Sequence, residues 1–282
     1  MPFLLLLALL TATEYGGVVV IPVANLYSAP SDESDVVSQA LYGTNVVVAE
    51  EKGGWVKVRT PDDYIGWMPL ASLRALGADE RPYGSAGRVV QVESLFANLY
   101  REPDVTKHQP LLTVPLETRL EVVAEQEGDD SLWLEVRLPD NRSAWVQRGD
   151  VTFDPKPLSI PQAIALSQRF LGLPYTWGGT SSFGYDCSGF VQMLIRRRGV
   201  IMPRDADLQA NWAGAMPVKR KKLKPGDLLF FGESAEKVTH TGMYIGRGKF
   251  IHATTNQHPV IQISRLSDQP WTKLLVACRR VK

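Results

Sequence analysis

The chain has 282 residues, of which 44% are hydrophobic and 22% charged, and its 31 basic and 30 acidic side chains leave a net charge of +1. This composition is typical of a globular protein with two or three domains, each large enough to bury a core. The balance excludes a chain-wide positive field that would attract nucleic acid. Its two cysteines are too few for a disulfide framework, so a thiol is available for chemistry.

The N-terminus contains an apolar run, residues 3–10, that is too short for a bilayer span of about 20 residues. The small residues Ala12 and Thr13 behind it favour the apolar middle of a secretory signal, although the first basic side chain is Lys52. We expect no stable membrane span. A signal over residues 1–12 would place the protein in the periplasm or cell envelope; otherwise the run opens the first domain of a cytoplasmic protein.

The first half of the chain contains an internal repeat. ANLYSAP, residues 24–30, returns as ANLYREP, residues 97–103, and WVKVRTPDDYIGW, residues 55–67, returns 78 positions later as WLEVRLPDNRSAW. Both copies alternate apolar and polar residues between turn signals. Two small all-β barrels are therefore predicted, at residues 13–80 and 85–153.

A third domain is predicted at residues 157–282, where Pro161 follows Ser159 in a helix-start pattern. A second helix is expected over residues 188–198, after the stretch GYDCSGF that holds Cys187. The positive end of that helix would lower the thiol pKa from about 8.5, which favours a nucleophilic thiolate.

A nucleophilic cysteine needs a base, and two of the four histidines lie in one predicted hairpin, residues 240–254. If the loop is residues 246–248, position 240 lies opposite 254. His252 is then a diagonal neighbour of His240 on the same face, with Cα atoms roughly 7–8 Å apart. One imidazole could deprotonate Cys187 while the other fixes its tautomer.

Other interpretations remain open from the residues alone. Cys187 could be a buried structural residue, or it could bind zinc with both histidines and Cys278, although no C-x-x-C pair is present. We favour neither, expect neither metal nor cofactor, and place Cys278 in a core strand. The basic run KRKKLK, residues 219–224, could bind an anionic polymer, but a solvated loop is favoured because Pro225 and Gly226 follow it.

Residues 173–282 resemble the NlpC/P60 cell-wall cysteine peptidases. The matching segments, in order, are LPYTWGGTSSFGYDCSGFV (173–191), MPRDADLQ (202–209), LKPGDLLFF (223–231), HTGMYIG (240–246) and FIHAT (250–254). The two N-terminal copies resemble bacterial SH3-like domains. The resemblance implies an α+β papain-like catalytic domain preceded by two small all-β SH3-like barrels.

The same resemblance implies roles for individual residues. Cys187 would be the nucleophile, His240 the general base and His252 the orienting residue, with the backbone N–H of Cys187 stabilising the oxyanion. The implied substrate-binding residues are Tyr175, Asp186, Ser188, Asp205 and, from the first SH3-like domain, Tyr64. The second copy has Arg142 at the position of Tyr64, and Glu33 and Asp35 are candidates for a further acid near the substrate amine.

The implied function is a cysteine endopeptidase that hydrolyses peptidoglycan stem peptides between γ-D-Glu and a diamino acid, meso-diaminopimelate or Lys. Two SH3-like domains before the peptidase are similar to members that act on short peptides with a free N-terminal L-Ala. The expected partners are such peptides, without nucleic acid, and the expected state is a monomer. The alternative is a wall-binding module with an inactive peptidase domain.

Overall fold

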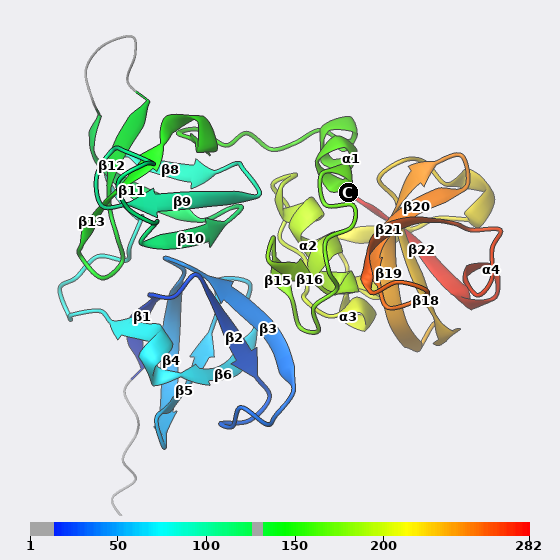
Figure 1. Cartoon of the computed structure of the whole chain (residues 1–282). Coiled ribbons are helices and arrows are strands. Elements are labelled where there is room, and N and C mark those ends of the chain that lie inside the picture. Colours follow the sequence, from blue (N-terminus) through cyan, green and yellow to red (C-terminus); the bar gives the residue numbers. More distant parts are fainter. Residues whose placement is uncertain (1–13, 126–131) are drawn as a thin grey trace, which may run out of the picture.

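The computed structural model describes residues 14–125 and 132–282, which form two β units and a C-terminal α+β unit (Figure 1). The predicted signal segment, residues 1–12, lies outside the described residues. Across the described residues, none of the helices combines the length and the apolar character that a membrane crossing requires.

The first β unit is a seven-stranded antiparallel sheet with the order β3-β2-β6-β5-β4-β1-β7. Its strands are β1 (Tyr15–Val19), β2 (Val23–Tyr27), β3 (Val36–Leu41), β4 (Asn45–Lys52), β5 (Trp55–Arg59), β6 (Ile65–Pro69) and β7 (Leu73–Ala75). A short helix, η1 (Leu70–Ser72), precedes β7. Alternation along the strands buries one face, as in β5, where Val56 and Val58 are fully buried.

The second β unit repeats the first, with the strand order β10-β9-β13-β12-β11-β8-β14. Its strands are β8 (Val89–Val92), β9 (Phe96–Tyr100), β10 (Leu112–Pro115), β11 (Arg119–Glu125), β12 (Trp133–Arg137), β13 (Ser143–Gln147) and β14 (Val151–Thr152), with η2 (Arg148–Asp150) before β14. Each strand of the second unit has the same place in its sheet as the strand of the first unit whose number is seven lower, so that β8 corresponds to β1. The sequence repeat is therefore also a repeat of topology.

The C-terminal unit packs helices against a six-stranded antiparallel sheet with the order β17-β22-β18-β19-β20-β21. The strands of this sheet are β17 (Ala215–Pro217), β18 (Leu228–Ser234), β19 (Lys237–Gly246), β20 (Lys249–Thr254), β21 (Val260–Arg265) and β22 (Leu275–Val281). Two further short strands, β15 (Thr180–Ser181) and β16 (Gly184–Tyr185), pair with each other. The helices of the unit are α1 (Ile160–Gln168), α2 (Cys187–Arg196), α3 (Ala206–Ala210), η3 (Arg220–Lys222) and α4 (Trp271–Leu274). The apolar face of α2 is entirely buried in the core between helices and sheet.

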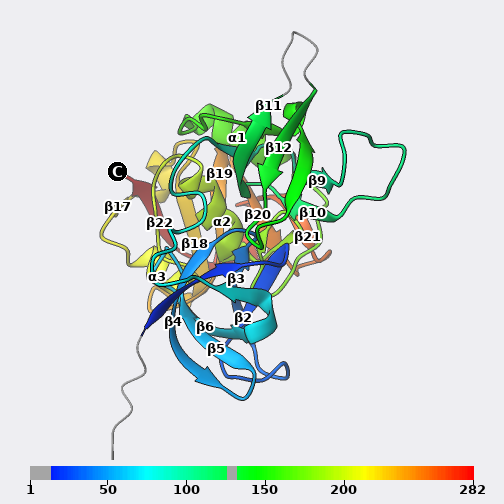
Figure 2. The same cartoon turned by 90° about the vertical axis from the view of Figure 1, so that its left-hand side faces the viewer.

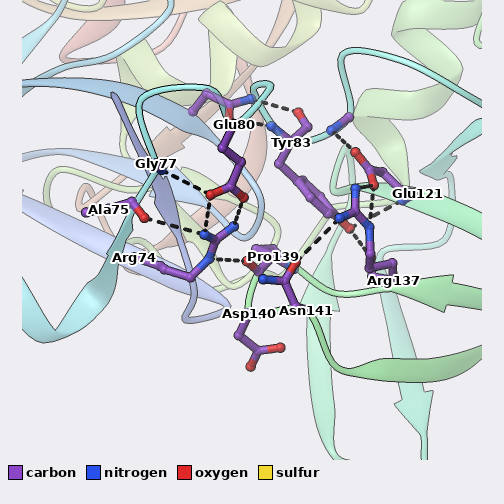
Figure 3. A network of polar contacts seen from close by, with 12 residues as sticks. Arg74, Ala75, Gly77, Glu80, Tyr83, Glu121, Arg137, Pro139, Asp140 and Asn141 are labelled. Atoms are coloured by element: carbon purple, nitrogen blue, oxygen red, sulfur yellow. Dashed lines mark hydrogen bonds and ion pairs between the residues drawn. The ribbon is translucent and has the colours of Figure 1, made fainter. Parts of the chain in front are cut away.

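The two β units are joined by a shared core and a polar network. The Tyr42 side chain, from the turn after β3, packs in the hydrophobic cluster of the second unit. In Figure 3 the Arg74 guanidinium pairs with Glu80 and donates to the Pro139 carbonyl across 2.6 Å. The Tyr83 hydroxyl likewise donates to a backbone carbonyl of β12.

Both β units lie against the helical side of the C-terminal unit (Figures 1 and 2). The second unit contributes the buried side chain of Leu116 to the C-terminal core, and its Glu117 accepts from Arg196 at 2.7 Å. The first unit contacts the helix that begins at Cys187, because Asp62 accepts from Gln192 of α2 at 3.0 Å.

Candidate active site

Cys187 is the first residue of α2, and Asp186 is the N-cap. The Asp186 carboxylate accepts from the Gly189 N–H at 2.7 Å, which fixes the first turn of the helix. Gly189 is required here, since a Cβ atom would meet the Gly179 carbonyl oxygen at 2.2 Å. The helix begins at Cys187, one residue earlier than predicted. The backbone N–H of Cys187 therefore lies in the first turn, where N–H groups have no hydrogen-bond partner within the helix.

His240 and His252 lie on β19 and β20, and their ring nitrogens Nε2 and Nδ1 are 2.7 Å apart. The strand register confirms the predicted hairpin, because Met243 pairs with Ile251 and Tyr244 with Phe250. The predicted three-residue loop is wrong by one residue: Gly246 pairs with Lys249 after a bulge at 245. The bulge leaves the register of the two histidines unchanged.

Aromatic side chains enclose the histidine pair. The Trp271 ring centroid lies 5.1 Å from that of His240 and 4.7 Å from that of His252, and Phe231 and Phe250 complete the enclosure. Burial in this apolar surround lowers the pKa of His240 to about 4 and places that of His252 well below its usual value. Both imidazoles are neutral at pH 7. Trp271 belongs to none of the motifs used above, and no pattern in the sequence predicts its contact with the histidines.

The tautomers of His240 and His252 depend on a third residue, Ser264. His252 Nε2 lies 3.0 Å from the hydroxyl of Ser264 on β21. If His252 donates to Ser264, its Nδ1 accepts from His240 Nε2, and the remaining nitrogen of His240, Nδ1, carries a lone pair. That is the tautomer a general base requires. The sequence did not predict a role for Ser264, because it lies on a different strand from His252 and no motif joins the two residues.

The resting thiol differs from the prediction of a lowered pKa. Burial raises the pKa of Cys187 to about 12 and the Asp186 charge adds to this rise, while the backbone N–H of Thr241, the Arg204 charge and the Ser188 N–H oppose it. Desolvation in the closed site therefore outweighs the helix N-terminus. The hydrogen bond from the Thr241 N–H places the thiol beside β19, the strand that also carries His240.

A buried arginine organises the residues that flank Cys187, and the sequence patterns did not predict this role. Arg204, 3% exposed, lies 2.5 Å from Asp186 and donates to the Ser188 hydroxyl at 2.7 Å. Its Nε donates to Ser38 of the first β unit at 3.3 Å. The sequence signal for this role was the position of Arg204, directly before Asp205 in a segment predicted to line the pocket. A buried arginine there needs an acidic partner, because arginines are rarely fully buried without one.

The predicted substrate-binding residues from two units meet at this place. Tyr64, after the β5–β6 turn, has its pKa raised to about 12 by burial and by its contact with Asp205. Burial and the Cys187 sulfur raise the pKa of Tyr175, so that phenol lies near the Cys187 thiol. Burial also raises the pKa of the Asp205 carboxyl, while the Arg204 charge and, more weakly, the Tyr64 phenol oppose this rise.

The remaining candidates lie elsewhere. Cys278 is 6% exposed on β22 in a cluster with Leu229 and Phe231, and the described residues contain no group of three or more His, Cys, Asp or Glu side chains suited to a metal ion. The acids Glu33 and Asp35 are exposed in the loop between β2 and β3.

The chain is similar to known families in both its N-terminal and its C-terminal parts. Residues 172–280 match the NlpC/P60 family and residues 26–73 match the bacterial dipeptidyl-peptidase Sh3 domain. A Bacillus cereus γ-D-glutamyl-L-lysine dipeptidyl-peptidase is 36% identical over 79% of this chain and 68% of its own length. The Bacillus subtilis protein of the same name is 30% identical over 87% and 81%. The chain belongs to the NlpC/P60 peptidase family, with an N-terminal SH3 domain.

Among solved structures, an NlpC/P60 family protein from Bacillus cereus superimposes with a TM-score of 0.81 at 29% identity. The match covers 94% of this chain and 99% of that protein. The placement of the β units against the peptidase unit is therefore shared with that protein.

Proposed function

We propose that this protein is a cysteine endopeptidase that hydrolyses peptidoglycan stem peptides between γ-D-Glu and the diamino acid. The observation that carries the proposal is that the Cys187 thiol lies against β19 at Thr241, on the strand whose His240 begins the chain of contacts to His252 and Ser264. The relatives named γ-D-glutamyl-L-lysine dipeptidyl-peptidases support the bond and the substrate class. The papain-like arrangement and the SH3-like nature of the second β unit are part of this proposal, and the repeated strand order supports the latter.

In this mechanism the neutral thiol gives its proton to Nδ1 of His240 as sulfur attacks the γ-carbonyl carbon of D-Glu. His252 accepts from His240 Nε2–H and thereby stabilises the imidazolium that forms. The backbone N–H of Cys187, at the start of α2, is positioned to donate to the oxyanion, with Tyr175 nearby. His240 then protonates the leaving amine of the diamino acid, and water hydrolyses the thioester with His240 as base.

The substrate is a short peptide with a free N-terminal L-Ala. Asp205 and the Tyr64 phenol lie at the junction of the first β unit and the peptidase unit, and together they suit an ammonium group. Arg204, Asp186 and Ser188 form the polar wall between this junction and the thiol. A first β unit that contacts α2 leaves less room for a longer chain beyond L-Ala.

The test uses L-Ala-γ-D-Glu-diaminopimelate tripeptide, with and without an acetylated N-terminus, and mass spectrometry of the products. The free tripeptide should be cleaved by the parent protein and not by Cys187→Ala, while Cys278→Ala should retain activity as the matched thiol control. Lack of cleavage by the parent would support the alternative, a wall-binding module with an inactive peptidase. Equal cleavage of the free and the acetylated tripeptide would reject the proposed site for the amine but would still support the endopeptidase activity.

A further inference from the structure

The basic run of residues 219–224 lies beside cations from distant parts of the chain. It includes η3, and the Arg220 guanidinium donates to the Leu266 carbonyl at 3.0 Å, at the end of β21. Arg247 lies in the β19–β20 turn, and Lys249 pairs directly with Arg265 across β20 and β21. We define Arg220, Arg247, Lys249 and Arg265 as the basic face.

The basic face surrounds two neighbouring hollows. The smaller, about 300 Å³, is lined by three of its arginines, Arg220, Arg247 and Arg265. The larger, about 540 Å³, is lined by Arg247 and Lys249. Both share Arg247 and Tyr244, and no acidic side chain lines either one. Across residues 14–125 and 132–282, none of the four cations forms a salt bridge with an acid.

This concentration of like charges lowers the stability of the fold. Lys249 and Arg265 are directly opposite on adjacent strands, and like charges in that position destabilise a sheet. Lys219, Lys221, Lys222 and Lys224 add further positive charge on the adjoining segment. Since the whole chain carries only +1, the rest of it is net negative and the positive potential gathers here.

We propose that the basic face binds a phosphate-bearing polyol polymer, with successive phosphate groups in the two hollows. Guanidinium groups match phosphate geometry, and Arg247 lies between the two hollows and can contact adjacent groups. This binding uses neither Cys187 nor the histidines. The context of an anionic cell-wall polymer rests on the proposed function.

The same surface suits a nucleic acid or a membrane less well. Single-stranded nucleic acids stack their bases on exposed aromatic rings, whereas Tyr244 is partly buried and its hydroxyl accepts from the Gly248 N–H at 3.0 Å. Membrane surfaces bind through exposed apolar side chains among the basic ones. None of the exposed large hydrophobic residues lines either hollow.

The test measures binding of the full chain to labelled poly(glycerol phosphate) by fluorescence anisotropy over a range of salt concentrations. The variant Arg220→Gln/Arg247→Gln/Arg265→Gln should bind at least tenfold more weakly, with a shallower dependence of affinity on salt. The control Lys52→Gln/Arg81→Gln/Arg101→Gln removes the same charge at exposed positions and should bind within twofold of the parent. Arg247→Gln alone, in an exposed turn, should weaken binding severalfold and covers the case in which the triple variant misfolds.

Several outcomes would reject the proposal: no binding by the parent, equal weakening in the control, or displacement of the polymer by single-stranded DNA at equal phosphate concentration. Binding to phosphatidylglycerol vesicles as tight as to the polymer would also reject it, in favour of a membrane. Hydrolysis of the free tripeptide should be the same in the triple variant and the parent. Polymer binding without hydrolysis would therefore reject only the proposed function, and hydrolysis without polymer binding would reject only this inference.

Discussion

Arg204 Nη2 and Asp186 Oδ2 are 2.5 Å apart, and this pair links the residue before Cys187 to the first β unit. The Arg204 side chain is 2% exposed and that of Asp186 is 11% exposed. Since Asp186 also caps α2, the pair fixes the start of the helix from which the Cys187 thiol projects. The Arg204 guanidinium therefore supports three features: the N-cap of α2, the polar side chains beside the thiol, and the contact between the first β unit and the peptidase unit.

Replacing this arginine should be strongly destabilising. Arg204→Met leaves the buried Asp186 charge without its partner, which typically costs about 3–5 kcal/mol. The control is Arg142→Met, whose pair with Asp140 is exposed, with 58% of the Arg142 side chain accessible, and should cost less than about 1 kcal/mol. Urea unfolding followed by tryptophan fluorescence measures both, and equal losses would contradict the proposed importance of the buried pair.

The histidine pair should make the protein sensitive to mild acid. In the folded state the pKa of His240 is about 4, whereas an unfolded histidine titrates near 6.5. Between these values the unfolded state binds more protons, so the free energy of unfolding falls as pH is lowered from about 6.5 to 4. For His240 alone the loss is on the order of 3 kcal/mol, and His252, whose pKa is also lowered, adds to it.

Thermal unfolding of the parent and of His240→Gln/His252→Gln at pH 7 and pH 4.5 measures this effect. The parent should lose the larger part of its stability on acidification, and the double variant should lose less because it lacks both groups. An identical loss in the two proteins would assign the acid sensitivity to other groups.

His252 should matter through the hydrogen bond that it accepts. His252→Leu removes the acceptor 2.7 Å from His240 Nε2, and kcat should fall by roughly 10²–10⁴ because the base loses its tautomer and its stabilised imidazolium. His252→Asn keeps an amide oxygen and should retain part of the rate. Steady-state kinetics on the free tripeptide distinguish the two, and equal activity in both variants would show that the acceptor does not determine the rate.

Much of this site was predictable because its determinants are local or follow a regular period. A turn-forming stretch before an apolar helix places Cys187, and a two-residue alternation places His240 and His252 on one face. The prediction for the thiol pKa is wrong, because burial in the folded protein is a tertiary effect that opposes the local helix field. Contacts made by Arg204, Ser264 and Trp271 join segments that only the complete fold brings together, so no local pattern identifies them.

Tyr64 should contribute to recognition of the substrate amine. Tyr64→Phe removes the phenol oxygen beside Asp205, and kcat/KM for the tripeptide with a free amine should fall by about tenfold or more, since hydrogen bonds to charged groups contribute about 1.5–3 kcal/mol. The matched control is Arg142→Ala at the equivalent place in the second repeat, which should leave kcat/KM unchanged. A tenfold loss in the control as well would mean that Tyr64 has no special role.

The docking of the first β unit should depend on a glycine in the peptidase unit. Gly178 has a φ of +71°, and a Cβ atom there would lie 2.5 Å from the Val36 carbonyl oxygen on β3. Gly172 has a φ of +84°, and a Cβ atom there would meet no other atom within 4 Å. Both alanine substitutions cost roughly 1–2 kcal/mol through the left-handed backbone, but only Gly178→Ala also forces β3 away from the site.

Gly178→Ala should therefore lower kcat/KM for the free tripeptide well beyond Gly172→Ala, and it should reduce the preference for the free over the acetylated amine. The reason is that Ser38 and Tyr64 reach Arg204 and Asp205 only when β3 is docked. Kinetics with both peptides, at a temperature where both variants are folded, provide the comparison. Indistinguishable kinetics would mean that close contact between β3 and the peptidase unit is not needed for selecting the amine.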